Sequence, residues 1–322
     1  MAFTRRRVLA GLAATALPRA AVAQSYPTRP VTLLVPFPAG SATDGVARKL
    51  ADGFRTAFNQ PFIIENKPGG DGIIAARMAA RAEPDGYTIF VTTNTTHSAN
   101  ANIYTSLPYD PEKDFLPVGG IMKIPMVMAV RKDFPATDVA SFVRAAKTRQ
   151  LTFGSGNTSS RGAAEIFKAR AALDMLHVPY RGTPQAVTDL AGGSIDVMFP
   201  DPSSALGAIE GGQIRMLAVA SSTRLRKYPN VPTIAESGYP GFEMVAWVGA
   251  FVPAKTPPDI VTRLNEELNR ILARDDTLTY FDTIGAQVYA TTPDGLRSYA
   301  AEDTRRWAEI VDLAKIEKKA SQ

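Results

Sequence analysis

Two short loops carry residues whose types and spacing suit the binding of an anion. They cover residues 37–44 and 154–161, and both are rich in glycine, alanine and hydroxyl-bearing residues. Small side chains let the backbone approach a ligand, and hydroxyl and backbone N–H groups donate hydrogen bonds without charge. Either loop alone could equally be a flexible turn. Together they predict an anion site formed by Phe37, Ala39, Gly40, Ser41, Ala42, Thr43 and Asp44, and by Ser155, Gly156, Asn157, Thr158, Ser159, Ser160 and Arg161.

Both loops stand between a predicted strand and a predicted helix. The apolar runs 31–35 and 151–153 precede them, and Thr43 or Asp44 is the expected N-cap of the first helix. In open α/β sheets, ligands lie beyond the carboxyl ends of strands, where helix N-termini present free N–H groups. This placement favours ligand binding over a purely structural turn.

Strands and helices alternate along the rest of the chain. Further strands are predicted over 62–65, 87–92, 178–180, 195–199 and 216–220, and helices over 43–58, 73–82, 258–273 and 293–315. The pair Asp275 and Asp276 is expected to be a helix cap and solvated turn between two helices and not a catalytic dyad. Repeated strand–helix–strand order predicts an α/β protein with mainly parallel sheets.

The sequence contains no complete catalytic motif. The stretch 70–75 matches the relaxed dinucleotide fingerprint in letters, but its loop is too long and no acidic strand end follows at the expected distance. Neither a Gly-x-Ser-x-Gly elbow nor a phosphate-binding loop occurs. His97 and His177 are the two histidines, and a lone histidine is more often structural than catalytic. We therefore expect a protein that is not an enzyme and that needs no cofactor.

Composition excludes several other classes of protein. The chain has no cysteine, which rules out disulfides, thiolate metal sites and a lipid anchor at a cysteine. Its 36 Lys and Arg against 31 Asp and Glu give a net charge of +5. Four of those arginines lie before residue 24, so the remaining chain has 32 basic against 31 acidic residues. Without a clustered basic surface, binding of nucleic acid is not expected.

Residues 1–23 resemble a secretory signal peptide. Three arginines at 5–7 precede an apolar run over 8–17, and Ala21-Val22-Ala23 is a small-x-small cleavage sequence. A ten-residue apolar run is too short to span a bilayer, which requires about 20 residues. The adjacent arginines also fit a twin-arginine signal, and an ordinary Sec signal is the alternative. We expect export to the periplasm, with a mature chain that begins near Gln24.

A longer series of motifs resembles the Bug-type receptors of tripartite tricarboxylate transporters. The similar segments follow one another in order over essentially the whole chain after residue 25, which makes the resemblance specific for the family but not for a ligand. They are residues 26–30, 35–44, 64–70, 84–88, 107–110, 177–182, 189–199, 229–233, 240–243 and 253–257, with Trp247.

This resemblance implies a type II periplasmic binding protein fold, in which two α/β domains enclose a ligand cleft. The first domain would comprise 24–122 and 243–322 and the second 123–242, with crossovers near 122–125 and 242–245. It also implies that the two loops bind a ligand carboxylate, and it adds weaker candidates. These are Thr95, Thr96, His97, Arg181, Gly182, Thr183, Pro200 and Asp201.

Three positions depart from the pattern of the family. Ser41 stands where a second glycine is usual, Arg161 where a histidine is common, and Pro200-Asp201-Pro202 where Asp-Asn often occurs. Arg161 either forms a bidentate pair with a carboxylate or points to solvent. The change around Asp201 leaves recognition of the far end of the ligand open.

The expected partners are a small organic acid and the integral-membrane subunits of a transporter. A signalling sensor is the alternative protein partner, and a periplasmic enzyme on the same fold is a remoter one. The receptor is expected to be a monomer. Citrate-like acids, dicarboxylates, acidic amino acids and aromatic carboxylates all suit a site built from neutral donors.

Overall fold

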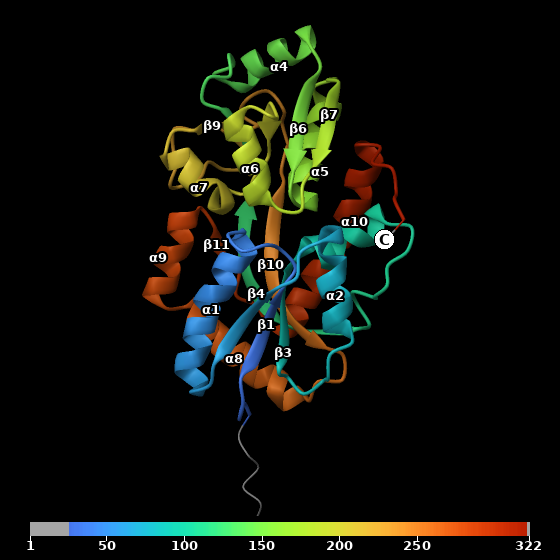
Figure 1. Cartoon of the computed structure of the whole chain (residues 1–322), viewed down its shortest axis with the longest axis vertical. Helices are drawn as coiled ribbons and strands as arrows, with labels where there is room; N and C mark the ends of the chain where they lie inside the picture. The colour runs from blue at the N-terminus through green and yellow to red at the C-terminus, as the bar shows by residue number, and fades with distance from the viewer. Residues whose placement is uncertain (1–25, 321–322) are drawn as a thin grey trace, which may run out of the picture.

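The computed structural model describes residues 26–320 and divides them between two sheets, each with its own helices (Figure 1). We call the six-stranded sheet with its helices the first lobe and the five-stranded sheet with its helices the second lobe. Figure 1 shows the lobes one above the other, with the long strand β10 between them. None of the helices in the described part combines the length and hydrophobicity that crossing a bilayer requires.

The first lobe contains the sheet β11-β4-β10-β3-β1-β2. Its strands are β1 (Val31–Val35), β2 (Phe62–Asn66), β3 (Thr88–Thr93), β4 (Phe115–Pro125), β10 (Val245–Pro253) and β11 (Gln287–Val288). Its helices are α1 (Ala42–Phe58), α2 (Ile73–Ala80), α3 (Asn100–Ile103), α8 (Pro258–Leu272), α9 (Asp275–Ile284) and α10 (Pro293–Leu313), with a short 3-10 turn η1 (Gly70–Gly72) and a π-helical turn η2 (Thr95–Ala99).

The second lobe contains the sheet β7-β6-β8-β5-β9. Its strands are β5 (Val127–Arg131), β6 (Leu151–Ser155), β7 (Met175–Pro179), β8 (Val197–Met198) and β9 (Ile214–Val219). Its helices are α4 (Val139–Thr148), α5 (Thr158–Arg170), α6 (Thr183–Gly192) and α7 (Pro202–Glu210). The type II periplasmic binding fold expected from the sequence is consistent with this architecture of two α/β lobes.

Helix α1 illustrates how the sequence specifies these elements. Val46, Leu50 and Phe54 recur every four residues, lie on one face and are completely or almost completely buried. Burial of each such side chain contributes about 1.5–3 kcal/mol. Phe54 also stacks on Phe62 at the start of β2, with ring centroids 4.9 Å apart. The apolar face therefore fixes α1 against the sheet and sets the position of its N-terminus.

The prediction of mainly parallel sheets was wrong. The pairs β1–β2, β1–β3, β6–β7 and β6–β8 are parallel, but all pairs that involve β4, β5 or β10 are antiparallel. These are the strands next to the places where the chain changes lobes. A chain that leaves one sheet and later returns to it reverses direction there, and the strand–helix alternation does not reveal this.

Two local predictions also need correction. Ser41 is the N-cap of α1, because its Oγ accepts a hydrogen bond from the N–H of Asp44 at 3.2 Å, so neither Thr43 nor Asp44 has that role. Asp275 and Asp276 do not form a turn but occupy the first turn of α9. Carboxylates are favourable there because they interact with the positive end of the helix dipole.

The chain changes lobes between β4 and β5 and again just before β10. At the first crossing the N–H of Met126 donates to the carbonyl of Met244 at 3.0 Å, and the carbonyl of Met126 accepts from the N–H of Ala220 at 2.8 Å. The N–H of Met244 donates to Ala220 at 2.8 Å. These bonds join the two crossings to the end of β9. The exact division into two domains stays a prediction.

Asp196 is the main polar anchor inside the second lobe. Its carboxylate accepts hydrogen bonds from the Thr152 N–H at 2.9 Å and from the Arg149 guanidinium at 2.7 Å. Burial by itself would raise the pKa of Asp196, but the bonds to Arg149 and Thr152 outweigh it and lower the pKa. The ionised carboxylate therefore joins α4, β6 and the start of β8.

We expect Asp196→Asn to lower the free energy of unfolding at pH 7 by about 1–3 kcal/mol, because charge-assisted hydrogen bonds are lost. The pKa is lower in the folded state, so this stabilisation is complete above the unfolded value of about 3.9 and disappears as the pH falls through the folded value. Urea unfolding at pH 7 and pH 3 tests this. Asp174→Asn, at an exposed carboxylate bonded to Gln150, is the control and should have little effect. An equal loss at both pH values would contradict the prediction.

Candidate functional site

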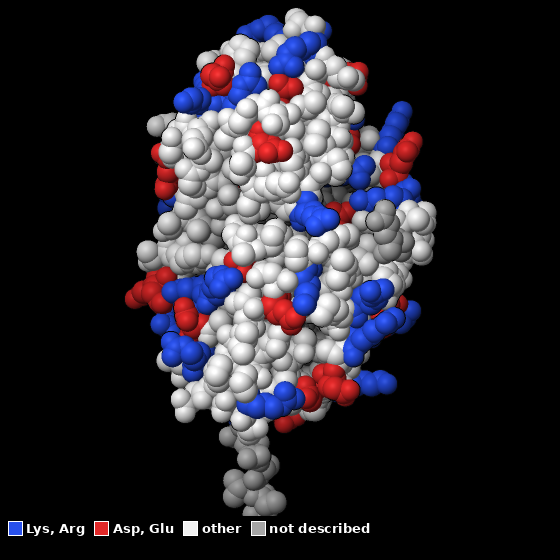
Figure 2. All heavy atoms as spheres, in the orientation of Figure 1, with Lys and Arg blue, Asp and Glu red and all other residues white. Residues whose placement is uncertain are grey.

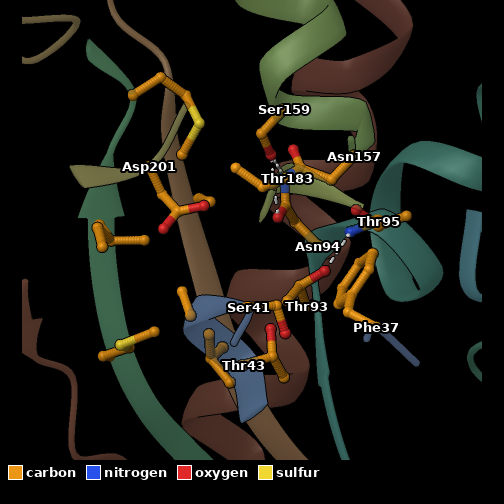
Figure 3. A pocket seen from close by; sticks show the side chains of 16 residues that line it. Phe37, Ser41, Thr43, Thr93, Asn94, Thr95, Asn157, Ser159, Thr183 and Asp201 are labelled. Atoms are coloured by element: carbon orange, nitrogen blue, oxygen red, sulfur yellow. Dashed lines mark hydrogen bonds between the residues drawn. The ribbon is translucent and has the colours of Figure 1, made fainter. Parts of the chain in front are cut away.

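A cavity of about 30 Å³ lies between the two lobes, and its lining divides into a polar and an apolar part (Figure 3). A volume of this size holds one or two water molecules. The polar part consists of Ser41, Thr43, Thr93, Asn94, Thr95, Asn157, Ser159 and Thr183. The remaining lining residues are Phe37, Ala42, Met122, Ile124, Met126, Ala246 and Val248, together with Asp201.

The first predicted loop reaches this cavity through Phe37, Ser41, Ala42 and Thr43. Ala39 and Gly40 lie in the loop but do not line the cavity. Gly40 has a φ of +81°, a conformation that glycine adopts without strain, and this turns the chain into α1. The loop therefore brings the N-terminus of α1 to the cavity.

Asp44 stabilises this loop and does not line the cavity. Its buried carboxylate accepts hydrogen bonds from the Gly40 N–H, from the Asn66 amide and from Nε and Nη2 of the Arg48 guanidinium, all at 3.0 Å. Burial by itself would raise the pKa of Asp44, but these bonds lower it. Its charge is thus balanced by Arg48 on α1, outside the cavity lining, which leaves the cavity to neutral donors.

The second predicted loop reaches the cavity through Asn157 and Ser159. Asn157 is the N-cap of α5, since its Oδ1 accepts from the Ser160 N–H at 2.9 Å, and its amide donates to the Thr183 hydroxyl at 3.1 Å. Gly156 lies against the start of α6, where an added Cβ would be 2.2 Å from the Thr183 nitrogen. The loop therefore sets the N-termini of α5 and α6 side by side.

Hydroxyl and amide groups join the lobes across the cavity. The Asn94 amide donates to the Ser159 hydroxyl at 2.9 Å, and the hydroxyls of Thr95 and Thr158 are 2.8 Å apart. Figure 3 shows Asn94 and Ser159 facing each other. On the other side, the Ala42 N–H donates to the Ser204 hydroxyl at 3.1 Å. These contacts belong to a closed arrangement of the lobes.

Thr96 and His97 do not reach the cavity. The Thr96 hydroxyl is bonded to Thr92 at 2.7 Å and to His97 Nδ1 at 2.9 Å. The His97 ring stacks on Phe251, with centroids 3.8 Å apart, and burial lowers its pKa to about 3. A neutral ring enclosed by the core of the first lobe is a structural residue.

Ser155, Arg161 and Arg181 also lie outside the lining. The Ser155 hydroxyl is 2.7 Å from His177 Nε2. Arg161 lies on α5 with its Nε 3.9 Å from a Glu165 oxygen, so its charge faces a carboxylate of the same helix. Arg181 lines a second, larger cavity of about 480 Å³, which shares Phe37 with the first. Thr158 and Ser160 are buried, and Ser160 Oγ has no partner among the described residues.

Asp201 is the one ionisable side chain among the described residues that line the cavity. It is the N-cap of α7, where its Oδ1 accepts from the Ser204 N–H at 2.7 Å. Asp201 is almost completely buried, and this burial raises the pKa of its carboxyl group. The cavity therefore combines neutral donors at one end with a single carboxyl group among apolar side chains at the other.

Sequence reasoning missed two kinds of lining residue. Thr93 and Asn94 follow β3 as the two predicted loops follow their strands, so the same strand-end rule could have found them. The apolar residues of β4 and β10, such as Met122 and Val248, have no signal that separates them from core residues. Their position in the lining follows only from the structure, in which the two crossings lie next to each other.

The described residues contain no group of three or more His, Asp or Glu side chains that could hold a metal ion. The lining residues offer neutral donors and acceptors with one carboxyl group. Such a lining suits a polar organic ligand. On the face seen in Figure 2, basic and acidic side chains are interspersed, without a broad basic patch.

Comparison with known proteins places these features in a family context. The sequence model described as "Tripartite tricarboxylate transporter family receptor" matches residues 46–316. The chain is 31% identical to the protein BugT of Bordetella pertussis over 294 residues, which is 90% of each chain. It is similar to MatC of Rhodopseudomonas palustris with bound malate, at 34% identity and a TM-score of 0.84 over 89% of this chain and all of MatC. A second R. palustris protein, with adipate, has 33% identity and a TM-score of 0.90 over 91% of this chain and all of that one.

Gly156 provides a test of how the second loop is built. We expect Gly156→Ala to lower the free energy of unfolding by about 1–3 kcal/mol, because the new methyl group overlaps the backbone of Gly182 and Thr183. Thermal unfolding followed by circular dichroism measures this. Gly192→Ala is the matched control, since a Cβ there meets nothing within 4 Å. An unchanged melting temperature for the Gly156 variant would show that the loop does not pack against α6 in this way.

Proposed function

The chain belongs to the tripartite tricarboxylate transporter family of receptors, and we propose that it binds a small organic carboxylate in the cavity between its lobes. The protein is thus a receptor and not an enzyme, as its family and its structural relatives are binding proteins. The titles of two similar structures name malate and adipate, which are carboxylates. The observation that supports the cavity as the site is the polar part of its lining.

Helix N-termini from both lobes converge on that polar part. Helix α1 begins at Ala42 and helix α5 at Thr158, and each has its N-cap side chain, Ser41 or Asn157, in the lining. The first N–H groups of a helix have no partner within the helix and favour a negative charge. We infer that a ligand carboxylate lies between residues 39–43 and 155–160, with the hydroxyls of Thr93, Thr95 and Ser159 as further donors.

We also propose where the receptor acts and with which partners. Residues 1–23 lie outside the described part, and their sequence supports export to the periplasm by a Sec or twin-arginine signal. The family identifies a tripartite transporter as the partner to which the ligand is delivered. We propose that the receptor is a monomer that presents both lobes to the membrane subunits.

Ser159 tests the location of the carboxylate. We expect Ser159→Leu to weaken binding of the ligand by about 10-fold or more, equivalent to about 1.4 kcal/mol, because the side chain fills the space next to Asn94. Ser159→Ala removes only the hydroxyl and should cost about 1 kcal/mol or less. Calorimetric titration with malate, adipate and small monocarboxylates such as 4-hydroxybutyrate as probes identifies an acid that binds, and the affinities of both variants for that acid are then measured.

Arg161→Ala is the control for charge on the same helix. Arg161 does not line the cavity, so its replacement by alanine should change the affinity for the ligand by less than about 2-fold. If Arg161 instead formed a charge-assisted hydrogen bond with the carboxylate, the loss of binding free energy would be about 1.5–3 kcal/mol. Near-native affinity of Ser159→Leu, or a large loss for Arg161→Ala, would place the carboxylate elsewhere.

Closure of the lobes follows from the size of the cavity. A cavity of about 30 Å³ bounded by hydrogen bonds between Asn94 and Ser159 requires the lobes to separate before a ligand enters. The crossings near 122–125 and 242–245 are the proposed hinge. We expect small-angle scattering to show a smaller radius of gyration at saturating ligand than without ligand. An identical profile in both conditions would exclude this motion.

A further inference from the structure

The end of the cavity that contains Asp201, which we call the far end, differs from the polar end in the charge of the ligand group that it can bind. Apart from its polar part, the lining consists of Asp201 and of apolar side chains, most of them from β4, β10 and the residues next to them, among them Met122, Met126 and Val248. No Lys, Arg or His occurs among the described lining residues. A second negative charge on a ligand would therefore meet no positive group at this end.

Asp201 is held in place by its surroundings. Its Oδ1 caps α7 through the Ser204 N–H, and hydrogen bonds from the Ser204 side chain and the Asp201 backbone partly offset the effect of burial on its pKa. Figure 3 shows the carboxyl group directed toward the space between α1 and the strands. Pro202 follows at the first position of α7. Its ring packs closely against Gly285, where an added Cβ would lie only 3.1 Å from the ring, so there is little room for the start of α7 to shift. Ser204 also bonds to the Ala42 N–H, so the distance from Asp201 to the first loop is fixed in the closed arrangement.

The same burial that acts on Asp201 would act on a ligand. Burial raises the pKa of Asp201, which means that these surroundings disfavour a negative charge. If Asp201 is ionised, it repels a second carboxylate. If it is protonated, its hydroxyl group donates a hydrogen bond, and a ligand carboxylate at this end still has to be desolvated without a cation. A ligand hydroxyl suits both states, because it donates to the ionised group and accepts from the protonated one, whereas an ammonium group suits only the ionised state.

We propose that Asp201 is a specificity-determining residue, which selects a compact monocarboxylate with a hydroxyl or amino donor at its far end and rejects dicarboxylates. The inference rests on the proposed function, since it places the carboxylate of the ligand at the polar end. It assigns this receptor a narrower ligand class than the family description implies.

A matched ligand series tests the proposal on the unmodified protein. Butyrate, 4-hydroxybutyrate, 4-aminobutyrate and succinate have equal chain lengths and differ in the far group, and the corresponding six-carbon compounds, with adipate as the diacid, form a second length series. Calorimetric titration at pH 7 should give at least one donor-bearing monocarboxylate that binds about 10-fold or more tightly than both the diacid and the unsubstituted acid of its length. The hydroxy and amino compounds distinguish the two donors.

The variant Asp201→Asn tests whether this residue is responsible. Asparagine retains the capping oxygen and cannot carry the negative charge of an ionised Asp201. The preference over the diacid should fall by about 10-fold, while the melting temperature changes little. Asp138→Asn is the matched control, because Asp138 caps α4 through the Ser141 N–H at the same distance of 2.7 Å but is exposed and far from the lining. It should leave the preference unchanged.

The outcomes separate the two proposals. Tighter binding of succinate or adipate than of the donor-bearing acids would overturn the role of Asp201 while leaving carboxylate binding intact. An unchanged preference in a folded Asp201→Asn variant would do the same. If no acid of either series binds and malate also fails, the proposed function falls, and this inference falls with it.

Discussion

A negative charge can be enclosed between two protein surfaces only if its hydration is replaced by donors that are already in position. Here these donors belong to two different lobes, so the structure depends on how accurately the lobes meet. Each lobe contributes a strand, a tight loop and the N-terminus of a helix. Loop 37–44 is stabilised internally by Asp44 and its three donors, and loop 154–161 by the Asn157 cap. Preformed loops of this kind lose little conformational entropy when a ligand binds.

The antiparallel pair β4 and β10 provides the connection that makes such closure possible. Both strands run in the first lobe, and both lie next to a crossing into the second lobe at Met126 and Met244. Two crossings that lie side by side restrict the relative motion of the lobes to a bend. A single connection would also leave the lobes free to twist. The bonds between Asn94 and Ser159 and between Thr95 and Thr158 are individually worth about 1 kcal/mol, so they can break when the cleft opens.

The sequence predicted the parts of this arrangement that depend on local rules. Strand β1, helix α1 and both loops were found because apolar runs, caps and small residues follow one another over a few positions. Thr183 was among the weaker candidates that the family resemblance supplied, and Thr93 and Asn94 required only the same rule applied to a further strand. The antiparallel strands and the apolar lining could not be found in this way, because Met122 and Val248 look like any core residue until the crossings lie side by side.

Two charged candidates, His97 and Arg161, do not line the cavity, for a reason that also bears on the chemistry of the cavity. His97 became a neutral core residue because burial opposes its charge, and Arg161 faces Glu165 on its own helix. A cation inside a cavity this small would have to lose its own hydration each time the cleft closed. Neutral donors avoid that cost, and they hold a carboxylate without regard to the rest of the ligand. Discrimination then depends on the opposite end, where one carboxyl group among apolar side chains is the strongest polar feature. Because that group sits on a helix cap in the second lobe, the proposed binding mode brings it to the ligand only when the lobes close, which would couple recognition of the far end to closure.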